Sequence, residues 1–141
     1  MPDTPKPIAL LIHEADVLLK REFERNARPF KLTLMQWRVL GVLRRNGAMK
    51  QVELGAATNT SAMTVSDVAE RLKCMGLVDR YADPDDSRAR LVALTETGEA
   101  QARTMRKVAD GVFERMLTGV APEDVDALTR ALLTITKNLE G

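Results

Sequence analysis

The sequence is poor in the residues that build metal sites and catalytic triads. Its 141 residues include one cysteine, Cys74, and one histidine, His13. A single thiol cannot form an internal disulfide, and one histidine with one cysteine cannot supply the usual zinc ligands, a Ser-His-Asp triad or a Cys-His pair built around a second histidine. These absences argue against most hydrolases and metalloenzymes. We expect a protein that is not an enzyme, with no catalytic residue, metal or cofactor.

Long hydrophobic runs are also missing. No window approaches the 18 consecutive apolar residues that a membrane span needs, and no positively charged segment followed by an apolar one comes after Met1. We therefore expect no membrane association and a cytoplasmic location. The content of 45% hydrophobic and 29% charged residues is typical of one globular domain, large enough to bury a core without disulfides.

The net charge of +1 hides a strong asymmetry along the chain. Residues 20–50 hold nine Lys or Arg against two acidic residues, while the rest of the chain holds twelve Lys or Arg against eighteen acidic residues, with no other segment strongly charged. A surface that faces phosphates produces such an asymmetry, although a solvated basic face produces it equally well. The candidates for phosphate contact in or near this stretch are Arg28, Lys31, Arg44, Arg45 and Lys50.

Apolar spacing predicts two helices in the first third of the chain. Three prolines in residues 2–7 predict a short flexible arm, and helical periodicity then runs from Ile8 to near Pro29. Thr33 followed by Gln36 is a capping box that opens the second helix. This helix carries Trp37 and has apolar residues on more than one side, which favours a core role for the tryptophan over ligand stacking.

The next segment has the pattern of a helix-turn-helix. Residues 50–57 can form two turns, and the polar run Thr58-Asn59-Thr60 interrupts them. Ser61 or Thr60 can cap a second helix, with apolar residues at helical spacing up to Met75, and Gly76 can end it. Alone, this pattern is common in helical proteins.

A predicted β-hairpin directly after this helix makes the pattern more specific. Leu77–Ala82 and Arg88–Leu94 alternate as strands do, and the cluster Asp83–Ser87 between them favours a turn. A helix-turn-helix followed by a hairpin is a winged helix. In this arrangement the second helix can enter a major groove while the hairpin reaches the flanking backbone or minor groove.

The last third is predicted to be two helices. Thr95 can cap the first, which runs to about Leu117, and Pro122 can open the second. In the final helix, apolar residues repeat at intervals of 3, 4, 3 and 4: Val125, Leu128, Leu132, Ile135 and Leu139. Such a narrow seam suits a partner helix, and two short strands cannot cover three long amphipathic helices. We therefore expect a symmetric homodimer.

Together these features resemble the MarR-type winged-helix transcriptional regulators. The resemblance rests chiefly on the glycine-ended helix before Leu77-Val78-Asp79-Arg80, the Asp-x-Arg element at Asp86 and Arg88, and the Leu-Thr-x-x-Gly element ending at Gly98. It implies a mainly α (α+β) fold with long terminal helices. Residues 31–97 would form the DNA-binding lobe, and residues 1–30 and 98–141 the helical dimerisation region.

The resemblance implies a homodimeric, ligand-responsive repressor of a pseudo-palindromic double-stranded operator. The reading helix would be Ser61–Met75, and a wheel of about 100° per residue turns Met63, Ser66, Asp67, Glu70 and Cys74 outward. Candidate contacts to bases or phosphates are Ser61, Met63, Thr64, Ser66 and Asp67. Ser61 could instead act only as a cap. Asp67 departs from the family, which often has a basic residue there; it would have to accept from a cytosine amino group or pair with Arg71.

At the hairpin tip, the resemblance places the Arg88 guanidinium in the minor groove, held in orientation by Asp86. Arg90 is a second candidate, although strand alternation could leave it on a solvated face. The alternative for Asp86 and Arg88 is a surface pair that only stabilises the turn.

Relatives commonly bind a small aromatic effector between the dimer helices and the DNA-binding lobe. The available markers for such a ligand site are His13 and Trp37, although His13 also fits a surface or interface position. Two alternative functions stay open: a redox-sensing regulator switched through Cys74, and a helical protein-binding adaptor, which would leave the hairpin motif without a purpose.

Overall fold

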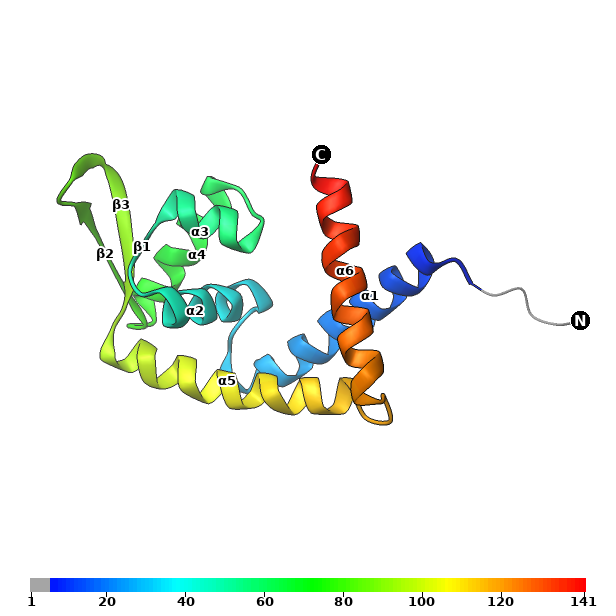
Figure 1. Cartoon of the computed structure of the whole chain (residues 1–141). Coiled ribbons are helices and arrows are strands. Elements are labelled where there is room, and N and C mark those ends of the chain that lie inside the picture. The colour runs from blue at the N-terminus through cyan, green and yellow to red at the C-terminus, as the bar shows by residue number, and fades with distance from the viewer. Residues whose placement is uncertain (1–5) are drawn as a thin grey trace, which may run out of the picture. The chain divides into compact units, whose positions relative to one another are not determined.

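The computed structural model describes residues 6–141, so most of the proline-rich arm, including Pro2 and Pro5, lies outside the described residues. The chain divides into two compact units, the first ending at Ala109 and the second running from Asp110 to Gly141. In chain order the elements are α1 (Ile8–Ala27), the short 3₁₀ turn η1 (Arg28–Phe30), α2 (Leu34–Asn46), β1 (Met49–Lys50), α3 (Gln51–Thr58), α4 (Ala62–Cys74), β2 (Val78–Asp83), β3 (Asp86–Leu94), α5 (Glu96–Met116) and α6 (Pro122–Glu140) (Figure 1).

The helix ends form where the sequence signals predict them. The backbone N–H of Gln36 donates to Thr33 Oγ1 at 3.1 Å, and the backbone N–H of Thr33 donates to Gln36 Oε1 at 3.0 Å, which completes the capping box of α2. Gly76 follows α4 with a φ of 76°, a conformation that favours glycine. It allows Leu77 N–H to donate to the Leu72 carbonyl and close the helix.

The sheet has three antiparallel strands in the order β1-β3-β2. The hairpin of β2 and β3 confirms the predicted wing, but its turn is shorter than the predicted Asp83–Ser87. Asp83 pairs with Asp86 across the strands, so only two residues lie between them. Both aspartates close the turn by accepting backbone N–H groups, from Asp85 at 2.9 Å and from Arg88 at 3.0 Å. The two-residue strand β1 was not predicted, because it is too short to show alternation.

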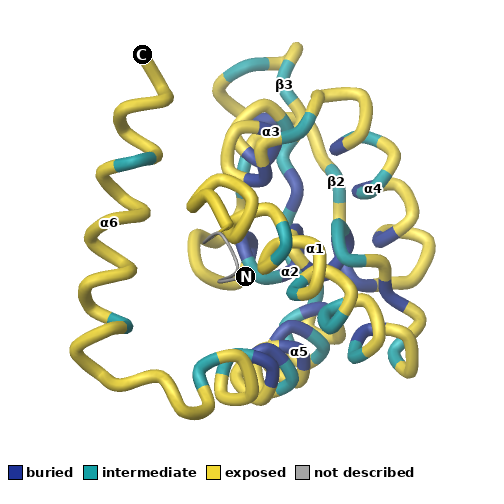
Figure 2. Tube along the Cα trace, turned by 90° about the vertical axis from the view of Figure 1, so that its right-hand side faces the viewer, coloured by how far each residue is buried: buried dark blue, intermediate teal, exposed yellow. Residues whose placement is uncertain are grey.

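One core holds the helix-turn-helix, the sheet and the start of α5 together. Val39, Leu40 and Val42 of α2 are all buried, so this helix is packed on more than one side, as its pattern predicts. The largest side chains with almost no exposure come from α2, α3, α4, both long strands and α5 (Figure 2): Val39, Leu40, Leu43, Leu54, Val65, Leu72, Val78, Val92 and Met105. The first unit is therefore a winged helix-turn-helix, mainly helical with a small sheet.

The apolar seam of α6 is largely solvent-exposed, with Val125 and Ile135 half-buried. No residue of this helix is buried, and it is exposed along almost its whole length in Figure 2. Leu128 and Leu139 lie among the exposed large hydrophobic side chains. An amphipathic helix whose apolar side faces water is typical of an interface. Between residues 6 and 141, no helix combines the length and apolarity that crossing a bilayer requires.

Gly98 lies at a close contact between the start of α5 and the end of α4. The Thr95 hydroxyl donates to the Gly76 carbonyl at 2.7 Å and accepts from Gly98 N–H at 3.0 Å. A Cβ atom on Gly98 would lie 1.9 Å from the Leu77 carbonyl oxygen, which is backbone and cannot rotate away. The glycine of the Leu-Thr-x-x-Gly element is thus required by packing.

We predict that Gly98→Ala lowers the free energy of unfolding by roughly 1–3 kcal/mol or more, because the methyl group forces α5 away from Leu77. Urea unfolding measures this change. Gly41→Ala in α2 is the matched control: its Cβ would meet only the end of the Arg45 side chain, at 3.6 Å, so we expect a gain of up to about 1 kcal/mol. Equal stability of the two variants would contradict the assigned contact.

Candidate nucleic-acid interface

Helix α4 has a buried side and a solvent-exposed side. Val65, Ala69 and Leu72 are buried in the core. On the opposite side Asp67 is exposed, and the Met63 side chain one turn earlier is 77% exposed. The predicted wheel is therefore confirmed, apart from Ser66, which is half-buried.

The first turn of α4 is organised by two hydroxyl groups. Ser61 Oγ accepts the Thr64 backbone N–H at 3.1 Å and donates its own hydrogen to Thr64 Oγ1 at 2.9 Å. The Ser61 hydroxyl is therefore used inside the fold, as the capping alternative predicts. Thr64 keeps its hydroxyl hydrogen, because its oxygen acts as the acceptor of that bond.

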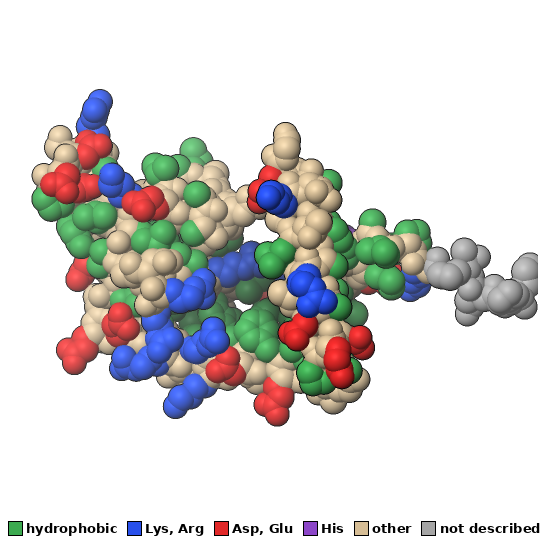
Figure 3. Space-filling view, viewed as in Figure 1, with side chains coloured by type: hydrophobic (Ala, Val, Ile, Leu, Met, Phe, Trp, Pro, Cys, Tyr) green, Lys and Arg blue, Asp and Glu red, His purple; other side chains and the backbone are tan. Residues whose placement is uncertain are grey.

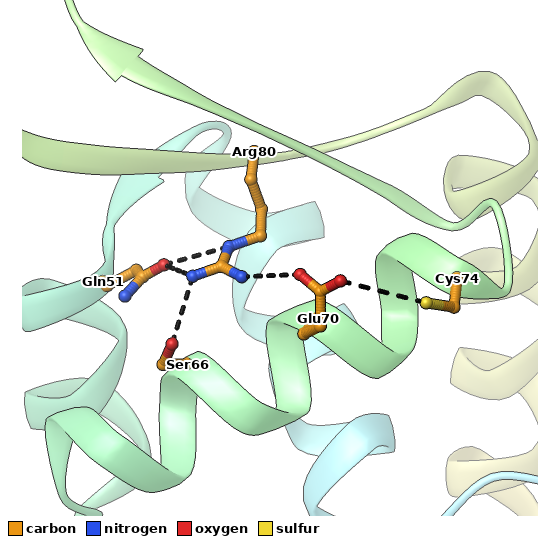
Figure 4. Close-up of polar contacts among 5 residues, drawn as sticks. All are labelled: Gln51, Ser66, Glu70, Cys74 and Arg80. Carbon is orange, nitrogen blue, oxygen red and sulfur yellow. Dashed lines mark hydrogen bonds and ion pairs between the residues drawn. The ribbon is translucent and has the colours of Figure 1, made fainter.

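A single guanidinium, that of Arg80 on β2, connects three elements (Figure 4). Its Nε donates to Gln51 Oε1 on α3 at 3.1 Å, Nη1 lies 2.9 Å from Glu70 Oε2 on α4, and Nη2 donates to Ser66 Oγ at 3.1 Å. The side chain of Arg80 is only 17% exposed. We call these four residues, Gln51, Ser66, Glu70 and Arg80, the Arg80 cluster.

The Arg80 cluster fixes the outer side of α4 relative to the hairpin. Ser66, a predicted DNA contact, accepts from Arg80 and so retains its hydroxyl hydrogen for donation outward. Sequence reasoning missed the roles of Arg80 and Gln51. One signal existed: Arg80 lies two residues after Val78 and so shares its face of the strand, and a cation directed toward the fold needs partners.

A second contact joins the end of β1 to the hairpin. Lys50, just before α3, lies with its Nζ 3.7 Å from the carboxylate of Asp83, which is buried at the end of β2. Two further basic residues, Lys20 and Arg25, form ion pairs with Asp16 and Glu22 on α1. The basic stretch therefore offers fewer unpaired cations than its residue count indicates, and Lys50 is held at the turn end of β2.

The hairpin tip presents Arg88 to solvent. The Arg88 side chain is 94% exposed, and its Nε lies 3.8 Å from Asp86 Oδ1. An ion pair this exposed contributes little to folding, so it leaves the guanidinium available. Arg90 is also exposed, opposite Ala82 on β2. Figure 3 shows basic and acidic side chains side by side at the tip, and another group of Lys and Arg over α2 and α5.

The two predicted ligand contacts lie far apart. Trp37 is buried in α2 and packs edge to face against Phe23 of α1, with ring centroids 5.0 Å apart. His13 is exposed on α1, ten residues before Phe23, which corresponds to about 15 Å along a helix. The structure thus does not bring His13 and Trp37 into one pocket.

Cys74 lies on the exposed side of the last turn of α4. Its Sγ is 4.0 Å from Glu70 Oε1, next to the Arg80 cluster (Figure 4). Among the residues that the structure describes, no three His, Cys, Asp or Glu side chains are grouped so that they could hold a metal ion.

Comparisons with known proteins agree with this geometry. The model of the MarR family matches residues 32–89. The transcriptional repressor IacR of Pseudomonas putida is 31% identical over 120 residues, covering 85% of this chain and 72% of IacR. The multiple antibiotic resistance protein MarR of Escherichia coli is 31% identical over 127 residues, covering 90% of this chain and 88% of that protein. Among solved structures, BpsR of Bordetella bronchiseptica superposes with a TM-score of 0.84 at 30% identity, covering 93% of this chain and 99% of BpsR.

We predict that Arg80→Gln lowers the free energy of unfolding by roughly 1–3 kcal/mol, because Glu70 and Ser66 lose a partly buried partner. Urea unfolding of Arg80→Gln, Glu70→Gln and the double variant measures the coupling of the pair, expected to be about 1 kcal/mol. Arg71→Gln, an exposed arginine on the same helix, is the control and should change stability by no more than about 0.5 kcal/mol. Strictly additive single effects would show that the ion pair does not couple β2 to α4.

Proposed function

Because the chain belongs to the MarR family of transcriptional regulators, we propose that it is a sequence-specific repressor that binds double-stranded DNA as a homodimer. The observation that carries this proposal is the arrangement of α4, whose inner side is buried while its outer side stays exposed and is fixed to the hairpin by Arg80. A rigid helix with an exposed polar side has the diameter and the hydrogen-bonding groups that fit a major groove.

Each part of the interface has a distinct task in this proposal. Thr64 and Ser66 donate from α4 to base edges or phosphates, and Met63 contacts a thymine methyl group. Arg88 at the hairpin tip enters the flanking minor groove, with Asp86 beside it and Arg90 near the backbone. Exposed cations such as Arg44 and Arg45 add contacts to phosphates, which carry affinity without sequence information.

The exposed seam of α6 supports the homodimer in this proposal. A second copy of the chain has the same apolar side on its own α6. If the two copies are related by a two-fold axis, the two apolar sides can pack against each other and become buried. A symmetric dimer presents two α4 helices to one face of the duplex, so its operator would be a pseudo-palindrome with half-sites about one helical turn apart. Residues 1–30 and 98–141 are the segments that we propose for this dimerisation region.

A small aromatic compound is the proposed effector. BpsR, the relative described above, has its DNA binding regulated by 6-hydroxynicotinic acid, a small aromatic acid. Such a ligand releases DNA if it binds better to a dimer whose reading helices misfit the operator. Trp37, packed against Phe23 between α1 and α2, and the exposed His13 remain the proposed contacts, on separate parts of the first unit.

Titration of the protein with fluorescent random duplex DNA at several salt concentrations tests the function. We expect affinity to fall with salt, at a logarithmic slope of roughly −0.9 for each phosphate neutralised. An enzyme or a protein-binding adaptor would show no such binding. Absence of duplex binding at low salt would rule out the proposal.

We predict that Arg88→Ala weakens binding to a selected operator by at least about 1 kcal/mol, because one minor-groove contact is lost. Anisotropy titration at moderate salt measures the change. Arg130→Ala on α6 removes the same charge from another exposed position and should leave the affinity nearly unchanged. If both variants bind like the wild type, Arg88 is not part of the interface.

We predict that Leu128→Glu shifts the protein from dimer to monomer, because a carboxylate replaces an apolar group in the α6 seam. Leu128 is 51% exposed in the single chain, so the substitution should not unfold the protomer. Sedimentation equilibrium at micromolar concentration measures the shift. Leu133→Glu, at a 67% exposed leucine outside the seam, is the control and should remain dimeric. A dimer that survives Leu128→Glu would place the interface elsewhere.

A further inference from the structure

The reading helix carries two carboxylates with different surroundings. Glu70 is held by the Arg80 guanidinium at 2.9 Å, which compensates its charge. Asp67 is exposed, and within residues 6–141 no Lys or Arg nitrogen lies within ion-pair distance of it, Arg71 included. The alternative in which Arg71 neutralises Asp67 is therefore not formed, and Asp67 presents an uncompensated negative charge.

Two hydroxyl groups on this side of α4 already accept hydrogen bonds within the fold and can donate outward. Thr64 Oγ1 accepts from Ser61, and Ser66 Oγ accepts from Arg80, so each has its hydroxyl hydrogen available for an outside acceptor. Met63 offers only an apolar contact. A carboxylate has no hydrogen to donate, so Asp67 can act only as an acceptor, and its exposed charge makes it the strongest unpaired acceptor that this side of α4 offers to a donor in the groove.

The major groove offers two kinds of donor, the amino groups of cytosine and adenine. The adenine amino group lies beside N7, whose lone pair repels a carboxylate, whereas the cytosine edge has no acceptor of its own in this groove. Guanine and thymine present acceptors there, which also repel a carboxylate. An unpaired aspartate close to phosphates therefore opposes binding at every base except cytosine.

We propose that Asp67 is a specificity-determining residue that accepts a hydrogen bond from the amino group of a cytosine in each operator half-site. This inference rests on the proposed function, since it requires α4 to lie in a major groove. The Arg80 cluster holds the neighbouring Ser66 and Glu70, so the side of α4 that carries Asp67 is fixed relative to the hairpin. The carboxylate acts both as an attractive contact to cytosine and as a repulsive one to the other three bases.

Selection of bound sequences from a random duplex pool, performed with four proteins, tests the proposal. These are the wild type, Asp67→Asn, Asp67→Ala and Asp79→Asn. The asparagine amide can both donate and accept, which matches the N7 and amino group of adenine. Asp79 is an exposed aspartate on β2, so its variant changes the net charge equally without altering α4.

We expect the wild type and Asp79→Asn to enrich the same half-site with a cytosine at one fixed position. Asp67→Asn should replace that cytosine by adenine, and Asp67→Ala should leave the position unselected. In titrations, substituting the cytosine should weaken wild-type binding about tenfold, the effect of one mismatched base pair, and should leave Asp67→Ala almost unaffected. Thermal unfolding of the variants, expected to match the wild type, separates base recognition from folding.

Identical half-sites for the wild type and both Asp67 variants would overturn the inference while leaving the proposed function intact. The same holds if the position altered by the Asp67 variants carries a base other than cytosine in the wild-type selection. By contrast, if no protein enriches any sequence or binds any duplex, the proposed function itself fails.

Discussion

Arg80 places a positive charge at the junction of β2, α3 and α4, and the desolvation of that charge is compensated only while its partners keep their positions. Its guanidinium donates in several fixed directions, toward Gln51, Ser66 and Glu70. A lysine could not replace this geometry, because its ammonium is a point charge on a flexible stem. This planar group therefore adds a directional constraint to the shared core that orients the hairpin and the reading helix, and the positions of the groups that would meet DNA depend on it.

Two ion pairs of this chain are used to hold its DNA-binding unit together. The ion pairs of Lys50 with Asp83 and of Arg80 with Glu70 both fasten the hairpin to the helix-turn-helix. Arg88 and Asp67 are left exposed to solvent, one at the hairpin tip and one on α4. Recognition of DNA would then depend on a few charged side chains at defined positions rather than on a high net charge. This is consistent with a net charge of +1 in a member of a family of DNA-binding regulators.

The two units of the chain differ in how they bury apolar surface. The first has its own core, in which residues such as Leu40 and Leu72 have no exposed surface. In the second unit, helix α6 has no buried residue. A partner copy is thus a structural requirement in our proposal. An effector that alters the packing of the dimer would change the spacing of the two reading helices without touching them.

Local rules in the sequence determined the approximate helix boundaries, the Thr33 cap, a cap at Thr60 or Ser61, the glycine after α4, the hairpin and the apolar seam of α6. Each of these follows from hydrogen bonds or periodicity within a few residues, so no distant contact is needed to predict it. The Asp-x-Arg and Leu-Thr-x-x-Gly elements pointed to the family, and the latter proves to be a steric requirement at Gly98.

Only the tertiary structure decided which side chains meet across elements. Arg80 and Gln51 are 29 residues apart, and Lys50 finds Asp83 only because β1 joins the sheet beside β3. Likewise, the separation of His13 from Trp37 depends on how α1 crosses α2. Periodicity assigns a residue to a face of its own helix or strand, but the partner on another element is fixed by the packing of the whole core, which no local pattern encodes.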